Sequence, residues 1–340
     1  VMQSVGRADI EEIEKAAQNT DGISGIPSGF YALDKITAGW QRSDMIVIAA
    51  RPAMGKTAFV LSMARNTAVD HNQGVAIFSL EMSSVQLVKR LIASETRLPA
   101  EKLRKGDLRD DEFQQLHTRI SKLATAPIYI DDTPGISIFD LRAKCRRLKM
   151  QYDIQMVIID YLQLMTAGGK SQGNREQEIS SISRSIKEIA KELNVPMIAL
   201  SQLSRSVEQR GGDKRPILSD LRESGAIEQD ADIVSFIYRP EYYGFLQDEE
   251  GNSNAGVGEI IIAKHRNGAL DSVRLRFIGQ YARFDNLETF EDTEAVQSNK
   301  ALMSANSEFE DQGTMTLQSK MNSLDDDVDF DPSTDGESPF

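Results

Sequence analysis

The stretch MIVIAARPAMGKTAFVLSMARNTA, residues 45–68, decides the fold. It begins with six apolar residues, which is typical of a strand buried on both faces of a parallel sheet. The next residues, ARPAMGKT (50–57), match the phosphate-binding pattern G-x-x-x-x-G-K-[ST], except that Ala50 stands where the pattern has glycine. An apolar helical run, AFVLSMARNTA, follows. Strand, loop and helix in this order predict a P-loop, whose backbone N–H groups and helix N-terminus bind phosphate.

The residues of this P-loop have different chemical roles. Gly55 lets the backbone approach a phosphate closely, Lys56 supplies a cation for the β- and γ-phosphates, and Thr57 supplies a hydroxyl for Mg²⁺. A small residue at position 50 still allows the turn. The alternative is a chance Gly-Lys-Thr in a turn, which would require the flanking strand and helix to be coincidental too. The other predicted nucleotide-contacting residues are Ala53, Met54 and Ala58.

Polar side chains stand at the ends of three further apolar runs. MVIIDYL ends a hydrophobic strand in Asp160, as expected for a carboxylate that holds the Mg²⁺ shell. VAIFSLEMS places Glu81 just past another strand, at the sheet edge where open α/β sheets bind ligands, and a carboxylate there can deprotonate a water. PMIALSQLSR places Gln202 at the same edge, where an amide can bond the γ-phosphate. The alternatives are a strand-end turn residue for Asp160, a helix N-cap for Glu81 and a solvated side chain for Gln202.

Short apolar runs alternate with longer amphipathic stretches from about residue 30 to residue 284. The runs that we expect to be strands are MIVIAA (45–50), VAIFSL (75–80), PIYI (127–130), MVIIDYL (156–162), PMIALSQL (196–203), DIVSFIY (232–238), EIIIAKH (259–265) and SVRLRFI (272–278). The first five show little alternation, which predicts burial on both faces of a parallel sheet. Isoleucines at helical spacing predict a helix from Glu176 to Leu193. The last strands follow one another with only turns between them, so an antiparallel edge is expected in a three-layer α/β domain.

The net charge of −13 is concentrated at one end of the chain. Residues 288–340 carry 14 acidic and 2 basic side chains, whereas the preceding residues carry 38 and 37. The bulk charge therefore neither favours nor excludes a nucleic-acid partner, because local clusters of Lys and Arg make the phosphate contacts. The closing LDDDVDFDPSTDGESPF is too polar to offset the entropy of folding, and we expect disorder there.

Composition also bears on location. No apolar run reaches the roughly 18 residues of a membrane span, and the opening VMQSVGRADIEEIEKAAQ is too polar for a signal peptide. The single cysteine, Cys145, cannot form an internal disulfide, which is typical of a reducing cytosol. We therefore expect a cytoplasmic protein without membrane contact, in which Cys145 has a structural role.

Three parts separate along the chain. Residues 1–20 hold the helix-forming run ADIEEIEKAAQ, which has few apolar residues and needs a partner surface, so we expect a linker helix. Residues 21–287 form the α/β domain, which opens with DGISGIPSG (21–29), a linker or turn. Residues 288–340 form the acidic tail.

Six motifs resemble those of the DnaB-type replicative helicases in order and spacing. They are ARPAMGKT (50–57), SLEMS (79–83), IIDYLQL (158–164), LSQLSR (200–205), DLRESGAIEQDAD (220–232) and KHRNG (264–268). The resemblance covers about residues 25–286, and the last two motifs are far more specific than a P-loop. It implies a RecA-like P-loop NTPase fold with a mainly parallel central sheet and an antiparallel edge, with residues 21–287 as the motor domain. The family's N-terminal, primase-contacting domain has no counterpart here, so a fragment of a longer protein is expected.

The resemblance also implies roles for individual residues. Glu81 is then the catalytic carboxylate, Asp160 supports Mg²⁺ through a water, and Gln202 senses the γ-phosphate. Lys264 and Arg266 would reach the γ-phosphate held by the adjacent subunit, where an arriving cation accelerates phosphoryl transfer by roughly 10³–10⁵. The alternative is that both are ordinary charges at a strand end and turn, which the following Asn-Gly allows.

DNA contact is expected from two loops and one motif. The resemblance implies that the DLRESG segment grips the backbone of single-stranded DNA through Arg222, Glu223 and Gly225. Backbone N–H groups and an arginine can hold phosphates without reading bases. The glycine-rich loop 166–176 and the basic loop 204–229 would face the same strand, and for single side chains such as Arg210 the alternative is a solvated charge.

The function implied is an ATP-dependent replicative DNA helicase motor that uses Mg²⁺. The resemblance implies a homohexameric ring that moves 5′ to 3′ on single-stranded DNA and works with a helicase loader and primase; residue spacing shows neither the number six nor the polarity. Two rivals stay open, a RecA- or KaiC-like ATPase without unwinding activity and a non-enzymatic, nucleotide-stabilised platform. The tail resembles the tip of single-stranded DNA-binding proteins and would cover the basic loops or recruit partners, unless it only solubilises the chain.

Overall fold

A computed structural model describes residues 22–167 and 175–287, apart from the side chains of residues 222–224. The predicted linker helix (1–20) and acidic tail (288–340) lie outside these residues, so both stay predictions. None of the helices in the described part of the chain is long and apolar enough to pass through a lipid bilayer.

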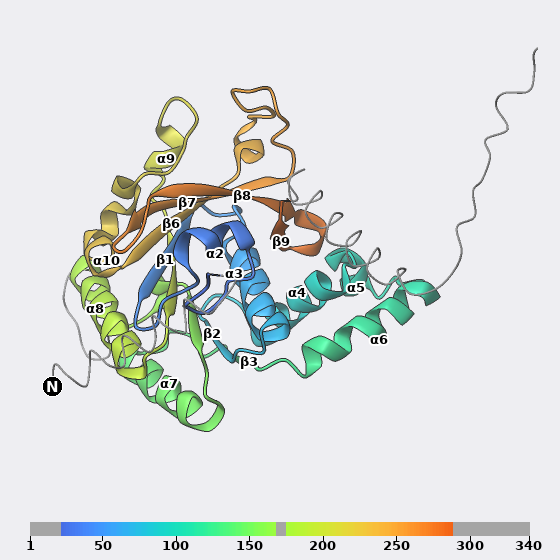
Figure 1. Ribbon diagram of the computed structural model, residues 1–340, viewed down its shortest axis with the longest axis horizontal. Helices are drawn as coiled ribbons and strands as arrows, with labels where there is room; N and C mark the ends of the chain where they lie inside the picture. The colour runs from blue at the N-terminus through green and yellow to red at the C-terminus, as the bar shows by residue number, and fades with distance from the viewer. Residues whose placement is uncertain (1–21, 168–174, 288–340) are drawn as a thin grey trace, which may run out of the picture. The chain divides into compact units, whose positions relative to one another are not determined.

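A nine-stranded sheet forms the centre of the fold (Figure 1). The strands lie in the order β3-β2-β4-β5-β1-β6-β7-β8-β9. Strands β1 to β6 pair in parallel, and β7, β8 and β9 are added antiparallel. This confirms the mainly parallel sheet with an antiparallel edge. The strands are β1 (Met45–Ala50), β2 (Val75–Ser79), β3 (Ile128–Asp131), β4 (Met156–Asp160), β5 (Met197–Gln202), β6 (Ile233–Tyr238), β7 (Val257–His265), β8 (Asp271–Ile278) and β9 (Arg283–Asn286).

Helices cover both faces of this sheet (Figure 1). They are α2 (Tyr31–Thr37), α3 (Lys56–Arg65), α4 (Ser84–Thr96), α5 (Ala100–Lys105), α6 (Asp110–Ala124), α7 (Ile138–Tyr152), α8 (Arg175–Leu193), α9 (Ser206–Gln209) and α10 (Gly225–Asp230). Short helical turns are η1 (Asn66–Asp70), η2 (Leu162–Leu164), η3 (Leu218–Ser224), η4 (Pro240–Tyr243) and η5 (Gly279–Tyr281). The predicted helix at 176–193 is thus confirmed as α8, one residue longer.

The central strand β1 divides the interior into two cores. Ile46 and Ile48 pack with α2, α3 and α4, whereas Met45 and Val47 pack on the other face with α7 and α8. All four side chains are fully buried. This is the three-layer arrangement expected from an apolar run without alternation, because successive side chains of a strand point to opposite faces.

Two details of the predicted sheet are wrong. The four residues of β3 are only half-buried, because β3 is an outer strand with β2 as its one neighbour in the sheet. The connection from β6 to β7 is also not a simple turn, since residues 239–256 and η4 intervene. The short turn between β7 and β8 is as predicted.

The segment 22–29 forms a turn packed on the domain. Ile26 is buried and pairs with Trp40. The Asp34 carboxylate accepts hydrogen bonds from the backbone N–H of Ser28 at 2.9 Å and of Gly29 at 3.0 Å. The turn interpretation of DGISGIPSG therefore holds for these residues.

Candidate active site

The P-loop lies between the end of β1 and the start of α3, as the sequence predicts. Gly55 has a φ of 95°, in the left-handed region that favours glycine, and Ala53 has a φ of 65°. A Cβ at Gly55 would lie 3.0 Å from the Phe284 ring and 3.3 Å from the Phe277 ring. Glycine is needed here for both reasons, and the rings of the antiparallel edge support the loop from behind.

The remaining P-loop positions contribute through their backbone. Met54 and Ala58 are buried in the core, so their side chains are not available to a ligand. Lys56 begins α3, which places the N-terminus of a ten-residue helix directly behind the loop. A helix N-terminus with free N–H groups is a favourable environment for a phosphate.

The Lys56 ammonium group lies among the ends of three strands. Its Nζ donates to the backbone carbonyl of Ser201 at 3.3 Å and lies 4.9 Å from the centre of the Tyr161 ring. Burial lowers the pKa of Lys56, and the carboxylates of Asp160 and Glu81 oppose that shift. A partly desolvated cation attracts an anionic ligand more strongly than one in bulk water, because the local dielectric constant is lower.

Thr57 and Asp160 form the candidate metal site. The Thr57 hydroxyl donates to Asp160 Oδ2 at 2.9 Å. Asp160 is 2 % exposed, and its Oδ1 atom is buried without a hydrogen-bond partner. Burial raises the pKa of Asp160, while the Thr57 hydroxyl and Lys56 lower it. A hydroxyl beside an unsatisfied carboxylate oxygen suits Mg²⁺, which prefers oxygen ligands and keeps several waters.

Glu81 lies two residues beyond β2, at the same edge of the sheet. β2 pairs with β4 so that Ser79 is level with Asp160, which brings the segment after β2 next to the candidate metal site. The Glu81 side chain is exposed. It does not cap α4, because Ser83 is the N-cap and its backbone N–H bonds to Gln86 at 3.1 Å. The N-cap alternative for Glu81 is therefore wrong.

Gln202 ends β5 and is level with Ala50 in the neighbouring β1. Its exposed side chain lines a cavity of about 410 Å³ at this edge of the sheet. Arg51 of the P-loop and Tyr161 line the same cavity. The four predicted residues Lys56, Glu81, Asp160 and Gln202 thus lie at one end of the parallel strands, Lys56 at the start of α3 and the other three at or just beyond the ends of β2, β4 and β5.

Lys264 and Arg266 lie beside the N-terminal ends of the parallel strands, whereas the P-loop of their own chain follows the C-terminal end of β1. Arg266 pairs with Asp232 at 3.4 Å, and Asp232 also accepts a hydrogen bond from the backbone N–H of Met45, the first residue of β1. The P-loop follows the last residue of that strand. At about 3.3 Å per residue the two sites are separated by roughly 17 Å along β1.

Both cations contact the C-terminal end of α10. Lys264 Nζ donates to the carbonyl of Ala231 at 2.8 Å and also to that of Glu228. Arg266 donates to the carbonyl of Gln229. Burial and the neighbouring Arg266 lower the pKa of Lys264. Cations at a helix C-terminus are favourable, and here they hold α10 against the end of β7.

The predicted DNA-binding residues lie on η3 and at the start of α10. Arg222 and Glu223 belong to η3, but their side chains are outside the described residues. Gly225 begins α10, is exposed, and has open space where a Cβ would stand. Most of the predicted loop 166–176 is also outside the described residues.

Two residues at the site, Arg239 and Tyr161, are not among those that the motifs predict. Arg239 follows β6, donates to the P-loop carbonyl of Ala53 at 3.3 Å, and stacks on the Phe277 ring at 3.9 Å. Tyr161 faces the Lys56 ammonium group. A signal for both was present, because each directly follows a parallel strand at the edge where Asp160 and Gln202 were found.

The chain is similar to known replication proteins over most of its described length. The family model "DnaB-like helicase C terminal domain" matches residues 25–286. The replicative DNA helicase DnaB of Geobacillus stearothermophilus is 56% identical over 271 residues, which are 79% of this chain and 58% of the relative. The chain spans less than two thirds of the length of the curated relatives it matches.

Solved structures give the same assignment. One of them, described as an ATPase domain, superposes with a TM-score of 0.76 at 42% identity and covers 84% of this chain and 99% of that one. A DnaB-like replicative helicase, described with its interactions with primase, gives a TM-score of 0.75 at 43% identity over 85% of this chain and 67% of that one. These likenesses agree with the RecA-like sheet and the P-loop geometry described above. The chain therefore belongs to the family of DnaB-like helicase C-terminal domains.

Proposed function

We propose that this chain is the ATP-hydrolysing motor of a replicative DNA helicase, which works as a ring of identical subunits around single-stranded DNA. ATP with Mg²⁺ binds at the P-loop, and hydrolysis is coupled to movement 5′ to 3′ on the encircled strand and to unwinding of the duplex. A hexamer, a helicase loader and primase are the assembly and partners that we infer, and the cytoplasm is the compartment.

One observation carries the proposal most directly. In one chain, the P-loop and the cations of KHRNG lie at opposite ends of the parallel strands. Lys264 and Arg266 therefore cannot serve the phosphate site of their own chain. A neighbouring copy in a head-to-tail ring would bring them to that site, as a heterologous interface does.

The residues at the P-loop fit phosphate-ester hydrolysis. Thr57 and Asp160 would hold Mg²⁺, which neutralises charge on the phosphates and leaves the metal's waters in place. Lys56 binds the β- and γ-phosphates. Glu81 is exposed at the same end of the strands as Lys56 and Asp160. It takes the proton of the attacking water as the bond between the γ-phosphorus and the bridging oxygen breaks.

The link to DNA runs through the segment after β5. Gln202 lies at the phosphate edge, and the chain continues from it to η3, which carries Arg222 and Glu223. Loss of the γ-phosphate would change the contacts of Gln202 and release the interface to the neighbouring Arg266. Successive firing around the ring then moves the bound strand.

ATP hydrolysis by mixed variants tests the neighbour's role. Arg266→Ala should retain nucleotide affinity but lose about 10³-fold or more in hydrolysis rate. Lys56→Ala should be inactive alone. Mixing the two proteins should restore activity, because in random head-to-tail rings about one interface in four combines an intact P-loop with an intact Arg266.

Arg276→Ala is the matched control, since Arg276 is an exposed arginine on the adjacent strand β8. It should behave like the wild type. No recovery on mixing, in a preparation shown to form rings, would exclude action across the interface. An assay of forked-duplex unwinding distinguishes a helicase from an ATPase without unwinding activity. An ATPase rate unchanged by Glu81→Gln would favour the non-enzymatic, nucleotide-stabilised platform.

A further inference from the structure

Arg51 lies in the P-loop, but its side chain contacts a different segment. It is 7 % exposed. Its Nε and Nη2 atoms donate to Glu208 Oε1 at 2.9 and 2.8 Å, and Nη1 donates to the carbonyl of Leu203 at 2.8 Å. The Leu203 N–H donates in turn to the Ala50 carbonyl at 3.2 Å. The P-loop is thus fastened to the segment after β5 by both backbone and side chain.

That segment is fastened at its other end to the start of the DLRESG motif. Arg210, two residues after Glu208, forms an ion pair with Asp220. Asp220 is 2 % exposed and also accepts a hydrogen bond from the backbone N–H of Ile217 at 2.8 Å. Its carbonyl accepts from the N–H of Ser204 at 3.2 Å. Asp220 therefore holds the start of η3, and Arg222 follows two residues later in the same element.

The contacts form one continuous chain across the cavity edge. They run from Arg51 to Glu208, along α9 to Arg210, and on to Asp220. Arg51 and Asp220 also line the same cavity of about 410 Å³. Hydrogen bonds between ionised groups are short and directional, and an arginine that uses several N–H groups fixes its partner's orientation.

We propose that Glu208 and Arg210 are positioning residues that couple the P-loop to the DNA-binding segment. The inference rests on the proposed function, because it assumes that DNA binds at η3 and ATP at the P-loop. A movement of the P-loop displaces Arg51, and the buried Arg51 guanidinium cannot leave Glu208 without losing its charge partner. The displacement therefore reaches Asp220 and η3 by a route separate from Gln202.

Stimulation of ATP hydrolysis by single-stranded DNA measures this coupling in the full 340-residue chain. We expect Glu208→Ala to bind a fluorescent ATP analogue with wild-type affinity and to keep the basal hydrolysis rate. The stimulation by oligo(dT) should fall about five-fold or more, the lower end of typical coupling between two sites. Glu208→Gln keeps an acceptor oxygen for Arg51 and should recover part of the stimulation. Arg210→Ala should reproduce the loss from the other end of the link.

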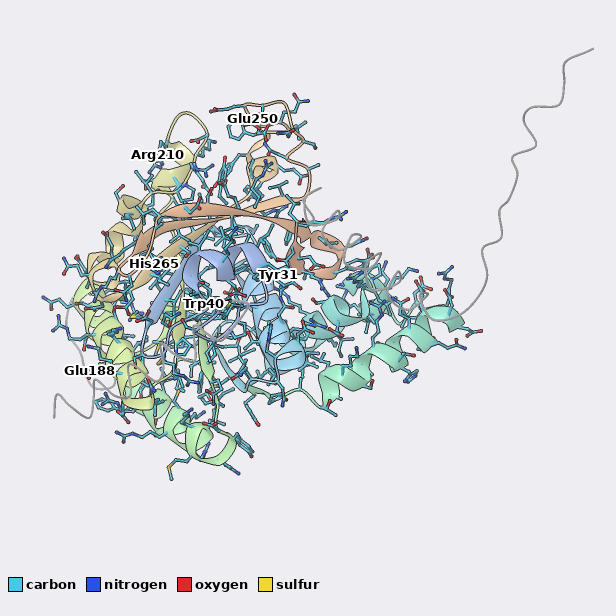
Figure 2. All side chains as sticks on the ribbon, in the orientation of Figure 1. Tyr31, Trp40, Glu188, Arg210, Glu250 and His265 are labelled. Atoms are coloured by element: carbon cyan, nitrogen blue, oxygen red, sulfur yellow. The ribbon has the colours of Figure 1, made fainter. Side chains whose placement is uncertain are left out.

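Glu188→Ala is the control, because it breaks a different Arg–Glu ion pair, to Arg142 at 3.2 Å, that does not contact the P-loop. Glu188 lies on α8, well apart from Arg210 (Figure 2). This variant should keep the full stimulation.

Three outcomes would overturn the inference. The first is a Glu208→Ala protein with the wild-type stimulation ratio. The second is an equal fall of the basal and stimulated rates in both Glu208 variants, because that indicates a purely structural contact. The third is a wild-type chain that hydrolyses ATP without responding to or binding oligo(dT), which would remove the proposed function together with this inference.

Discussion

At the scale of single residues, Asp160 is a side chain that the candidate metal site needs but whose burial lowers the stability of the fold. Burial raises the pKa of its carboxyl group above the value in the unfolded chain. Below the unfolded pKa the group is protonated in both states and burial of the charge costs nothing. As the pH rises through the folded-state pKa, the buried group ionises and stability is lost. At neutral pH the buried Asp160 side chain therefore lowers the stability of the fold, and a bound cation would offset that cost.

We predict that Asp160→Asn raises the melting temperature of the nucleotide-free protein at neutral pH while hydrolysis is lost. The gain should shrink as the pH falls to the ordinary range of an aspartate in an unfolded chain, about 4, because the carboxyl group is then protonated in both the folded and the unfolded state. Thermal unfolding between these pH values checks this. Asp153→Asn is the control, because Lys149 lowers the pKa of the exposed Asp153 and neutralising it should bring no gain. A neutral-pH melting temperature for Asp160→Asn at or below wild type would contradict the prediction.

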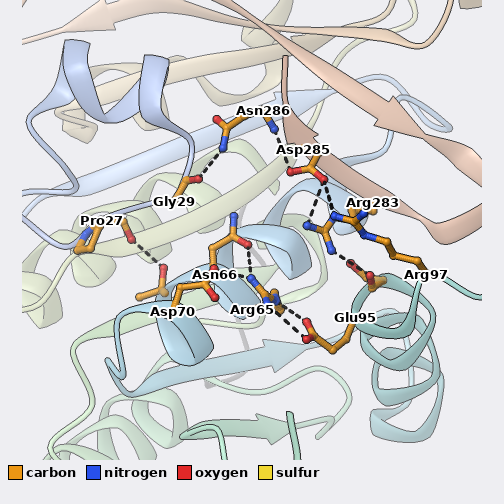
Figure 3. Close-up of polar contacts among 12 residues, drawn as sticks. Pro27, Gly29, Arg65, Asn66, Asp70, Glu95, Arg97, Arg283, Asp285 and Asn286 are labelled. Carbon is orange, nitrogen blue, oxygen red and sulfur yellow. Dashed lines mark hydrogen bonds and ion pairs between the residues drawn. The ribbon is translucent and has the colours of Figure 1, made fainter. Parts of the chain in front are cut away.

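At the scale of elements, a cluster of ion pairs and hydrogen bonds holds the far end of the P-loop helix α3 (Figure 3). Arg65, the last residue of α3, pairs with Glu95 of α4 and with Asp70. Arg283 of β9 donates to the Ser94 carbonyl at 3.0 Å. These contacts join α3, α4 and the antiparallel edge behind the phosphate site.

Glu95→Ala should lower the free energy of unfolding by about 1.5–3 kcal/mol, the range for hydrogen bonds to charged groups. The Glu95 side chain is 7 % exposed, so its loss leaves Arg65 partly unpaired in a buried place. Asp70, at 49 % exposure, is the comparison on the same arginine, and Asp70→Ala should cost less than about 1 kcal/mol. Urea unfolding measures both, and equal losses would show that burial does not govern this cluster.

The elements also show where sequence patterns lose information. The run PIYI correctly predicts a strand. However, an apolar run occurs both in the outer strand β3 and in the central strand β1, so the run itself does not show where in the sheet its strand lies. Position in the sheet depends on which strands pair, and no local pattern contains that order. Residues 239–256 likewise have no counterpart in the strand pattern, although Arg239 at their start contacts the P-loop.

At the scale of the whole molecule, the charge distribution gives a further prediction. Deletion of residues 288–340 changes the net charge from −13 to −1. If the tail covers the basic loops, the shortened chain should bind oligo(dT) more tightly at low salt. The difference should fade as salt shortens the screening length to about 10 Å near 0.1 M. Fluorescence anisotropy over a salt series measures this.

A tail of the same length with its acidic residues replaced by Asn and Gln separates charge from bulk. It should bind like the deletion if charge is the cause. Unchanged affinity in both variants would leave the tail with a solubilising role.

The sequence alone determined the parts of this protein that depend on local order. Residues 45–68 fix a strand, a glycine turn and a helix N-terminus, because apolar continuity, backbone freedom at Gly55 and helical periodicity act over a few neighbouring residues. Polar residues at the ends of parallel strands likewise predicted Asp160, Glu81 and Gln202, since such ends meet at one edge.

Only the tertiary structure decided which groups face one another across that sheet. It placed Lys264 and Arg266 a full strand length from their own P-loop, and it joined Arg51 to Glu208 across more than 150 residues of chain. Contacts of this kind depend on strand order and on the packing of loops after the strands. The physical reason is that a charge's partner is set by distance in space, and the sequence specifies that distance only through the complete fold.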